Sequence, residues 1–389
     1  MKIHLCLVSD QPIPNLLPVV NMATRPDKVV LAVTADMQRK RKDKYLKKVL
    51  GNYVKDIEEL QIEDPYDIQK CCKIFVEWLL KQIKANPGAE ICLNTTGGTK
   101  PMSLGAVSAF WSDTDVDRKV FYVDRNRLIY FNNEIEIVNL ENKLTLSDII
   151  GLHGGTINYE EPEVKWEKFS DTMFSEPRKW AVALSKLNRY ATGAANDPEG
   201  VYEVNLENVP QNWNKMIDLL CENGIIVNDE SCQFIQFSSE EARRFANGGW
   251  IEQKVFSIAQ SLQEDISDIK MNVMVSRGNN INELDIAGVY KNSLLIIECK
   301  TQRFSTDDQD KDPINQAIYK LNYLKDPANG LGGLKTIAIL VSFLPVPPHA
   351  KERARKNGMI LFDQKDIPNL KHRLQEELSK NKCQIAFQP

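Results

Sequence analysis

The sequence has 389 residues, 42% of them hydrophobic, and a formal net charge of -4. That length predicts two or three domains, and the hydrophobic content supplies packed cores, which excludes global disorder. Tight nucleic-acid binders usually carry a basic excess that this chain lacks, although a local basic groove is compatible with its charge balance.

Nothing in the sequence points to a membrane or to a secreted, disulfide-rich protein. No run approaches the roughly 18 apolar residues that cross a bilayer, and the start of the chain lacks the apolar core of a signal peptide. The eight cysteines form no CxxC pair, and the four histidines are too scattered for a zinc site. We therefore expect a cytoplasmic protein with reduced thiols and no membrane partner.

Strand-like and helical segments alternate in residues 1–147. This alternation predicts parallel pairing with right-handed crossovers, and so a doubly wound, Rossmann-like α/β domain. The expected strands are Ile3–Val8, Val29–Thr34, Ile57–Ile62, Ile91–Asn94 and Val120–Asp124, and the expected helices are Leu16–Met22, Met37–Val54, Tyr66–Ile83 and Met102–Ser112. A hairpin of Leu128–Phe131 and Ile135–Val138 should follow, because Asn132 and Asn133 tolerate the positive φ of a tight turn.

Residues 148–247 are expected to form a linker and a small connector. Gly151–Pro162 has a linker-like composition. The connector's expected elements are helices at Lys179–Tyr190 and Trp213–Asn223, a small hairpin of Gly224–Asn228 and Gln233–Phe237, and a charged helix at Ser239–Asn247. Their order vaguely resembles a winged helix, but no recognition helix is evident.

Residues 248–389 form the third predicted unit, a second α/β domain. The expected helices are Trp250–Gln263, Ile314–Leu324, His349–Lys356 and Leu370–Ser379, and the expected strands are Lys270–Ser276, Glu283–Tyr290, Ser293–Lys300, Thr336–Phe343 and Met359–Phe362. In the third of these strands, Leu294, Ile296, Glu298 and Lys300 share one face, and Leu295, Ile297 and Cys299 share the other. Apolar residues on both faces predict a central strand that is covered on each side.

The end of that central strand carries charged residues that could form a metal site. Glu298 and Lys300 lie two residues apart on one face, and the short Tyr290–Ser293 turn brings the preceding strand, with Asp285, alongside. Two adjacent carboxylates repel each other unless a cation lies between them, and Mg²⁺ or Mn²⁺ prefers such oxygen ligands. Asp285 and Glu298 are therefore the predicted metal ligands.

The remaining predicted catalytic residues surround this pair. A metal ion at this position can activate a water molecule and polarise a phosphoryl oxygen, and Lys300 can stabilise the negative charge that develops. Glu252, on the preceding helix, is expected to complete the acidic cluster, and Gln316, on the following helix, to position water or substrate. The alternative is a simple surface ion pair of Glu298 and Lys300, with Asp285 in a solvated turn.

A second constellation follows the strand Ile91–Asn94. Glycines at a strand-to-helix turn let backbone N–H groups approach an anion, and the helix N-terminus favours negative charge. The predicted ligand loop comprises Asn94, Thr95, Thr96, Gly97, Gly98, Thr99, Lys100 and Met102. Ligands of doubly wound sheets bind beyond the carboxyl ends of the strands, where Ser9, Asp10, Gln11, Pro12 and Thr34 are also expected.

Two nucleotide-binding motifs are excluded for this loop. It has neither the GxxxxGK[ST] spacing of a P-loop nor the GxGxxG spacing of a dinucleotide site, and Pro101 follows Lys100. The simplest alternative is a polar turn that caps a helix, with Thr99 as the N-cap and Pro101 near the first helical position.

The C-terminal order of helix with Glu252, strand with Asp285, strand with Glu298 and Lys300, and helix with Gln316 resembles the PD-(D/E)xK restriction-endonuclease-like superfamily. The segment departs from the motif at Leu284, where many members have proline. Together with the loop Asn94–Met102, this segment makes nearly the whole chain resemble the CARF-domain ancillary nucleases of type III CRISPR systems. Residues 94–102 match the family's ligand loop well, whereas Ser9–Pro12 and Thr34 match by position more loosely.

That resemblance implies a homodimer in which two CARF domains bind a cyclic oligoadenylate, usually cyclic tetra-adenylate, as the activator. It also implies a metal-dependent nuclease that cuts single-stranded RNA or DNA or nicks duplex DNA in antiviral defence. Two other functions stay open on the residues alone. One is a ligand-responsive, DNA-binding regulator with an inactive nuclease fold, and the other is a small-molecule enzyme with a nucleotide cofactor at Gly97 and Gly98.

Overall fold

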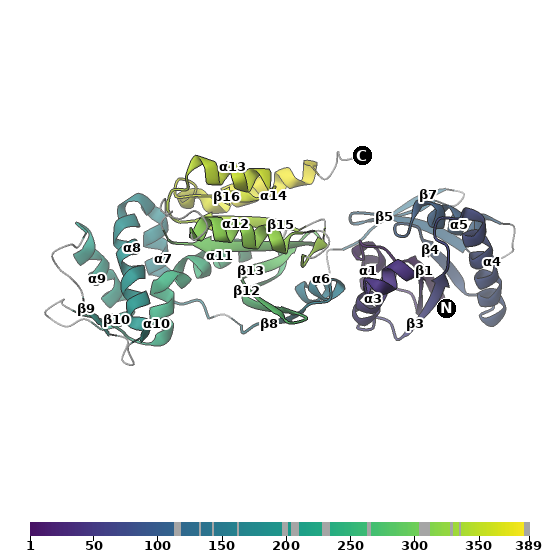
Figure 1. Ribbon diagram of the computed structural model, residues 1–389, viewed down its shortest axis with the longest axis horizontal. Coiled ribbons are helices and arrows are strands. Elements are labelled where there is room, and N and C mark those ends of the chain that lie inside the picture. The colour runs from purple at the N-terminus through teal and green to yellow at the C-terminus, as the bar shows by residue number, and fades with distance from the viewer. Residues whose placement is uncertain are drawn as a thin grey trace.

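The computed structural model describes residues 1–112, 118–131, 134–141, 144–161, 163–196, 201–203, 210–227, 234–262, 266–302, 312–326, 330–333 and 336–384. Three parts follow one another along the long axis of the molecule (Figure 1). The N-terminal domain lies at one end, the C-terminal α/β domain is central, and a small helical module lies at the other end. Among the described residues, no helix is long and apolar enough to cross a membrane.

The N-terminal domain is built on a seven-stranded sheet. Its strand order is β3-β2-β1-β4-β5-β6-β7, and its strands are β1 (Lys2–Leu7), β2 (Lys28–Thr34), β3 (Asp56–Ile62), β4 (Glu90–Asn94), β5 (Arg118–Asp124), β6 (Arg127–Phe131) and β7 (Ile135–Asn139). The first five strands pair in parallel and the last two add an antiparallel meander. Both the predicted parallel sheet and the predicted hairpin strands are confirmed, while the Asn132-Asn133 turn lies outside the described residues.

Helices cover both faces of this sheet, as a doubly wound domain requires. The helices α1 (Ile13–Val20) and α3 (Lys42–Leu50) share one buried cluster, and α4 (Ile68–Ala85) and α5 (Lys100–Trp111) share the other. The single helix predicted at Met37–Val54 is wrong: α2 (Ala35–Arg39) and α3 are separate, because Arg41 takes a left-handed conformation with φ of 58°. A non-glycine residue in that region interrupts a right-handed helix.

One core residue of this domain predicts a pH-dependent stability. His4 on β1 is fully buried, and neither ring nitrogen has a hydrogen-bond partner among the described residues. Burial lowers the pKa of His4 to about 3, so the folded state keeps the ring neutral where the unfolded chain protonates it. The free energy of unfolding should therefore fall by about 1.4 kcal/mol per pH unit from this group as pH drops below about 6.5.

Replacing His4 with leucine tests this expectation. Because leucine neither titrates nor leaves an unpaired polar atom, His4→Leu should be neutral or stabilising at pH 7 and should flatten the pH slope. Urea unfolding of the full chain between pH 5 and 7.5 measures both quantities. The exposed His372 provides a matched control, since His372→Leu should keep the wild-type slope. An unchanged slope in His4→Leu would contradict the assignment.

The C-terminal domain contains a six-stranded mixed sheet. Its order is β16-β15-β14-β13-β12-β8, with β16 (Ile360–Phe362), β15 (Ile337–Ser342), β14 (Ser293–Lys300), β13 (Asn280–Tyr290), β12 (Ile266–Arg277) and β8 (Thr156–Asn158). The three strands from β14 to β16 are parallel, and the others are antiparallel. The turn between β13 and β14 has positive φ at Lys291 and Asn292, as a two-residue hairpin requires.

The two faces of β14 divide as its alternation predicts. Leu294 and Ile296 pack in the cluster that contains helix α12 (Pro313–Leu324). Leu295 and Ile297 pack on the other face, in the cluster of α11 (Trp250–Gln260) and α14 (Leu370–Gln384). The helix α13 (Pro348–Lys356) lies against α12 and β16. β14 is therefore buried on both sides, and only its carboxyl end can present polar groups.

The segment predicted as a linker is structured. The helix α6 (Leu146–Leu152) packs on α3 of the N-terminal domain and on β13 and β14 of the C-terminal domain. Just after it, β8 adds an edge strand to the C-terminal sheet, so the linker prediction for Gly151–Pro162 is wrong for the part that forms β8. The glycines that suggested a loop serve close packing instead, since a Cβ on Gly154 would stand within 2.8 Å of the Tyr45 ring.

The connector is a helical module with a small sheet. It contains α7 (Glu167–Ser175), α8 (Pro177–Gly193), α9 (Trp213–Glu222) and α10 (Glu240–Arg244), and its three strands are β9 (Val201–Glu203), β10 (Ile226–Val227) and β11 (Phe234–Phe237). The predicted helices and the antiparallel pairing of the hairpin are confirmed, although Asn228 and Gln233 lie outside the described residues. A kink at Asn247 and Gly248, where Gly248 has φ of 124°, separates α10 from α11, so the predicted helix Ser239–Asn247 does not continue into α11, and α7 was not predicted.

Candidate active site and ligand-binding loops

The hairpin of β13 and β14 brings the predicted acidic residues together. Ile286 pairs with Ile297, so the antiparallel register places Asp285 and Glu298 opposite each other one residue further on. Glu298 is only 2% exposed, and Asp285 Oδ2 accepts a hydrogen bond of 2.8 Å from the backbone N–H of Cys299. Facing residues on one side of an antiparallel pair have Cβ atoms about 5 Å apart. The two carboxyl groups therefore form one site.

Two lysines neutralise this acidic pair. Lys300 Nζ lies 2.8 Å from Glu298 Oε1 and 4.0 Å from Asp285 Oδ2. Lys320 Nζ, from α12, lies 2.6 Å from Glu298 Oε2. The Glu298 carboxylate is thus held between two ammonium groups, which satisfies the requirement that a buried charge be paired.

Sequence reasoning missed Lys320. The available signal was its position four residues after Gln316, which puts both side chains on the same face of a helix. The structure places Gln316 on α12, exposed, one turn before Lys320. Gln316 therefore lies on the predicted helix, and Lys320 on the same face provides the contact with Glu298.

Glu252 on α11 is close enough to this pair for the charge of Asp285 to act on it. Burial, and then the charge of Asp285, raise the pKa of Glu252 well above its usual range. Burial, and then the charge of Glu298, raise the pKa of Asp285 in the same direction. Although burial opposes it, the charges of Asp285 and Glu298 raise the pKa of Lys300. The site therefore holds more acidic groups than it can ionise without further positive charge.

The donor chemistry fits a hard divalent cation. The carboxylates of Asp285 and Glu298 supply oxygen ligands, which Mg²⁺ and Mn²⁺ prefer. The nearby Cys299 thiol is buried on the opposite face of β14, and burial raises its pKa, so it stays protonated. No group of three or more His, Cys, Asp or Glu side chains with metal-binding geometry occurs in the described part of the chain, so the residues in hand amount to a two-carboxylate site.

The second constellation lies at the switch point of the N-terminal sheet. β1 is flanked by β2 on one side and β4 on the other, so the connections from β1 and β4 leave in opposite directions. Ligands of doubly wound sheets bind in the crevice at this point. Of the predicted ligand residues after β1, Ser9 meets the loop after β4 there, since a Cβ on Gly97 would stand 3.3 Å from the Ser9 hydroxyl oxygen. Gly97 lies so close to β1 that a Cβ would stand 2.0 Å from the Leu7 carbonyl oxygen.

The side chain of Asn94 connects the two loops of this crevice by hydrogen bonds. Its Nδ2 donates to the carbonyl of Pro14 and to Asn15 Oδ1, both at 3.0 Å. Its Oδ1 accepts from the Thr96 N–H at 3.1 Å and from the Thr96 hydroxyl at 2.7 Å. Asn94 is fully buried, so it fixes one loop against the other rather than meeting solvent. Asn15, which was not predicted, belongs to this network because it also bonds the Leu7 carbonyl.

Several side chains that were predicted to bind a ligand form hydrogen bonds or pack within the domain instead. Thr99 is the N-cap of α5 and accepts from the Met102 N–H, which confirms the capping interpretation. Thr95 Oγ1 donates to the Phe121 carbonyl, and Met102 is fully buried in the core. By contrast Lys100 is exposed at the start of α5. Backbone N–H groups, the helix N-terminus and Lys100 are therefore the groups left to meet an anion.

Known proteins share this arrangement of domains. Residues 3–149 match the family model described as the Card1 CARF domain, and residues 239–381 match the Card1-like endonuclease domain. The two matches together take in most of the chain, in the order in which its folded domains occur. This chain belongs to the CARF-domain nucleases. No curated protein sequence matches it significantly.

Solved structures support the same assignment. The protein VC1899 from Vibrio cholerae is 26% identical, with a TM-score of 0.85, and the match covers 97% of this chain and 98% of that one. Can2 from Sulfobacillus thermosulfidooxidans, solved in complex with cyclic tetra-adenylate, is 28% identical with a TM-score of 0.77 and covers 97% of each chain. A type III CRISPR defence DNA nuclease activated by cyclic oligoadenylate shares the fold at 15% identity, a TM-score of 0.51, and coverage of 87% of this chain and 45% of that one.

The other predicted residues of the CARF domain occupy two different places. Thr34 is buried at the end of β2 and caps α2, accepting from the Met37 N–H. Asp10, Gln11 and Pro12 instead line a small cavity of about 30 Å³ with His153 and with Gly332 and Gly333 of the endonuclease domain. The loop after β1 therefore borders the ligand crevice at one end and the nuclease at the other.

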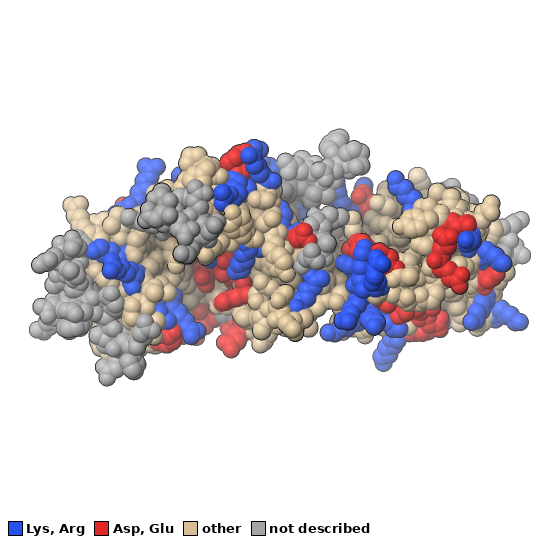
Figure 2. Space-filling view, viewed as in Figure 1, with Lys and Arg blue, Asp and Glu red and all other residues tan. Residues whose placement is uncertain are grey.

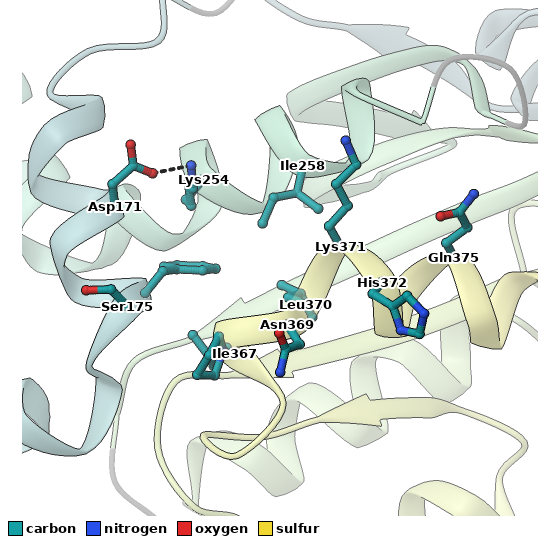
Figure 3. A pocket seen from close by; sticks show the side chains of 12 residues that line it. Asp171, Ser175, Lys254, Ile258, Ile367, Asn369, Leu370, Lys371, His372 and Gln375 are labelled. Carbon is teal, nitrogen blue, oxygen red and sulfur yellow. Dashed lines mark ion pairs between the residues drawn. The ribbon is translucent and has the colours of Figure 1, made fainter.

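Figure 3 shows a larger cavity, of about 520 Å³, whose lining residues do not include those of the acidic cluster. It opens between α7, α11 and α14, on the face of the endonuclease sheet opposite Lys320. Lys254 points into it beside its ion-pair partner Asp171, and Lys371 and His372 line the other side. Glu298 and Asp285 are not among its lining residues, so this cavity is separate from the acidic cluster.

Proposed function

We propose that this chain is a metal-dependent nuclease that cyclic tetra-adenylate activates in type III CRISPR defence. The observation that carries the proposal is the buried cluster of Asp285, Glu298, Lys300 and Glu252 at the end of β14, in a chain whose CARF domain has a switch-point crevice. The proposed reaction is hydrolysis of phosphodiester bonds in single-stranded RNA or DNA, or nicking of duplex DNA.

Each side chain has a definite role in this proposal. Mg²⁺ or Mn²⁺ held by Asp285 and Glu298 would supply an activated water and a polarised phosphoryl oxygen. Lys300 and Lys320, both within 2.8 Å of Glu298, hold its carboxylate in place and place positive charge where the phosphoryl oxygens gain negative charge. Glu252, with its raised pKa, can hold a proton near neutral pH.

The proposed activator site is the crevice at Asn94–Lys100. Cyclic tetra-adenylate carries several phosphates, and the Gly97-Gly98 turn, the α5 N-terminus and Lys100 supply donors and positive charge. The cavity that the Asp10–Pro12 segment shares with Gly332 and Gly333 supports a route to the endonuclease domain. Activation requires that the ligand bind the competent state more tightly, and this segment lies between the CARF domain and the endonuclease domain.

A homodimer is part of the proposal. Ile68 on α4 and Leu104 on α5 are 45% and 58% exposed, and Tyr66 before α4 is 75% exposed. These apolar side chains lie next to the ligand loop, because the Thr99 hydroxyl donates to the Pro65 carbonyl. An isologous contact through this face would bring two copies of the loop to one symmetric ligand.

Nuclease assays test the proposal directly. The full chain is incubated with labelled single-stranded RNA, single-stranded DNA and supercoiled plasmid, with Mg²⁺ or Mn²⁺, with and without cyclic tetra-adenylate. We expect cleavage only when metal and activator are both present. A folded protein that binds the activator and cuts nothing under any combination would refute it. Sequence-specific, metal-independent DNA binding would favour the regulator instead.

Metal binding should also depend on pH. Because the pKa of Asp285 is raised, metal must displace a proton at pH values where an ordinary carboxyl, with a pKa near 4, is already ionised. The apparent affinity for Mn²⁺ should therefore rise with pH above that range and level off once the carboxyls are ionised. Calorimetric titration of the full chain with Mn²⁺ from pH 5.5 to 8.5 measures it. Asp285→Asn should remove the binding, and an affinity that does not change with pH would contradict the expectation.

A further inference from the structure

One face of α12 is exposed and carries aromatic and polar side chains next to the acidic cluster. Gln316, Tyr319, Lys320 and Tyr323 follow the spacing i, i+3, i+4 and i+7, which places them in one stripe. The two tyrosines are 52% and 50% exposed. The opposite face of α12 is buried through Ile314, Ala317, Ile318, Leu321 and Leu324. The core therefore does not require the tyrosines, and their rings face solvent.

This stripe is continuous with the active site. Lys320 lies between the two tyrosines along the helix, and its Nζ reaches Glu298. The two rings thus lie one helical turn apart, on either side of a residue that contacts the acidic cluster. A polymer lying along the stripe would be directed to that cluster.

The neighbouring helix makes the stripe basic. Arg353 of α13 lies 5.7 Å from the Tyr319 ring centre, and it is held by Asn315 Oδ1 at 2.7 Å. The same helix carries Lys351, which is ion-paired with Asp363, and Arg355 and Lys356, which share the single carboxylate of Glu352. Lys and Arg side chains gather over α13 at the upper edge of the molecule in Figure 2. The net charge of the whole chain is negative, so this positive charge is local.

We propose that Tyr319 and Tyr323 form a stacking platform that holds single-stranded nucleic acid for the acidic cluster, with Arg353 facing its backbone. This inference rests on the proposed nuclease function and adds the substrate-holding residues. Aromatic rings beside positive charge bind single strands, because every base has a face that can stack. Residues four apart on a helix are about 6 Å apart along its axis, more than the 3.4 Å rise per stacked base in a duplex strand. An extended single strand therefore fits the spacing better than a duplex.

Substituting both tyrosines tests the platform. The wild type and Tyr319→Ala/Tyr323→Ala are compared in the activated full chain, using labelled oligo(dT), oligo(U) and a matched DNA duplex. The double variant should raise the KM for single strands about 30-fold or more, with kcat largely kept, and should affect duplex nicking much less. Anisotropy with the same oligonucleotides, in a Glu298→Gln background, should show the same loss of affinity.

Control variants separate stacking from other effects. Tyr319→Phe/Tyr323→Phe keeps both rings and should retain the wild-type KM. Tyr122→Ala removes a tyrosine of similar exposure (45%) in the CARF domain and should also leave the KM unchanged. An unchanged KM in the alanine double variant, or an equal loss for single strands and duplex, would overturn the platform while leaving the nuclease intact. If the activated wild type neither binds nor cuts nucleic acid, the proposed function fails as well.

Discussion

Glu298→Gln and Lys300→Ala should each abolish activator-dependent cleavage, with a loss of about 10³-fold or more for Glu298→Gln. Glutamine keeps the shape of the side chain but removes the charge that two lysines neutralise at 2.8 and 2.6 Å. Lys300→Ala removes the ammonium that faces both Glu298 and Asp285. Initial rates on labelled substrate, with saturating metal and cyclic tetra-adenylate, measure the effect.

The same variants should bind the activator normally, because the changes lie in the endonuclease domain. Thermal unfolding and calorimetry with cyclic tetra-adenylate check that each variant is folded and still binds. Glu376→Gln is the matched control, since this carboxylate forms only surface ion pairs on α14 and should leave the rate unchanged. Full activity in Glu298→Gln, with a normal control, would place the reaction elsewhere.

Asn94→Ala should remove the response to cyclic tetra-adenylate. Asn94 is fully buried, and its removal leaves the partly buried Pro14 carbonyl and Thr96 N–H without their shared partner. An unsatisfied buried group costs about 1–3 kcal/mol, so we expect the free energy of unfolding to fall by about 2–3 kcal/mol. If one symmetric ligand contacts this loop in both subunits of the dimer, a similar loss of free energy in each subunit predicts about 100-fold weaker binding or more.

Two measurements separate these effects. Calorimetry gives the affinity for cyclic tetra-adenylate, and urea unfolding gives the stability of the same preparation. Asn86→Ala is the matched control, because Asn86 makes only local hydrogen bonds at the end of α4, before β4 begins. It should leave the affinity unchanged. A folded Asn94→Ala protein with wild-type affinity would show that the crevice is not the activator site.

Much of the endonuclease site follows from local pattern. The alternation of β14 places Glu298 and Lys300 on one face, and the short turn before it places Asp285 on the adjacent strand. Strand periodicity and two-residue turns act over a few residues, so the sequence alone carries this information. Lys320 depends on how α12 packs across β14, 22 residues away in the chain. No local pattern specifies that contact.

In the ligand loop, tertiary packing decides more than the local sequence pattern does. Its residue types predict an anion site, yet Thr95, Thr96 and Thr99 bond to neighbouring groups of the same domain. Hydroxyls can satisfy a ligand or their own backbone, and composition does not distinguish the two. The parallel order of β2, β1 and β4 decides it, because that order creates the crevice and sets Asn94 beside Asn15.

By itself the sequence determined the alternating α/β order, the acid–lysine motif at Asp285–Lys300 and the glycine turn at Gly97-Gly98, since each depends on short-range spacing. Tertiary structure alone decided what depends on long-range packing. It broke the helix at Arg41, recruited β8 into the endonuclease sheet, and brought Lys320 to Glu298. It also placed the Asp10–Pro12 segment and Gly332 and Gly333 around one cavity, because only the folded core brings residues more than 300 positions apart together.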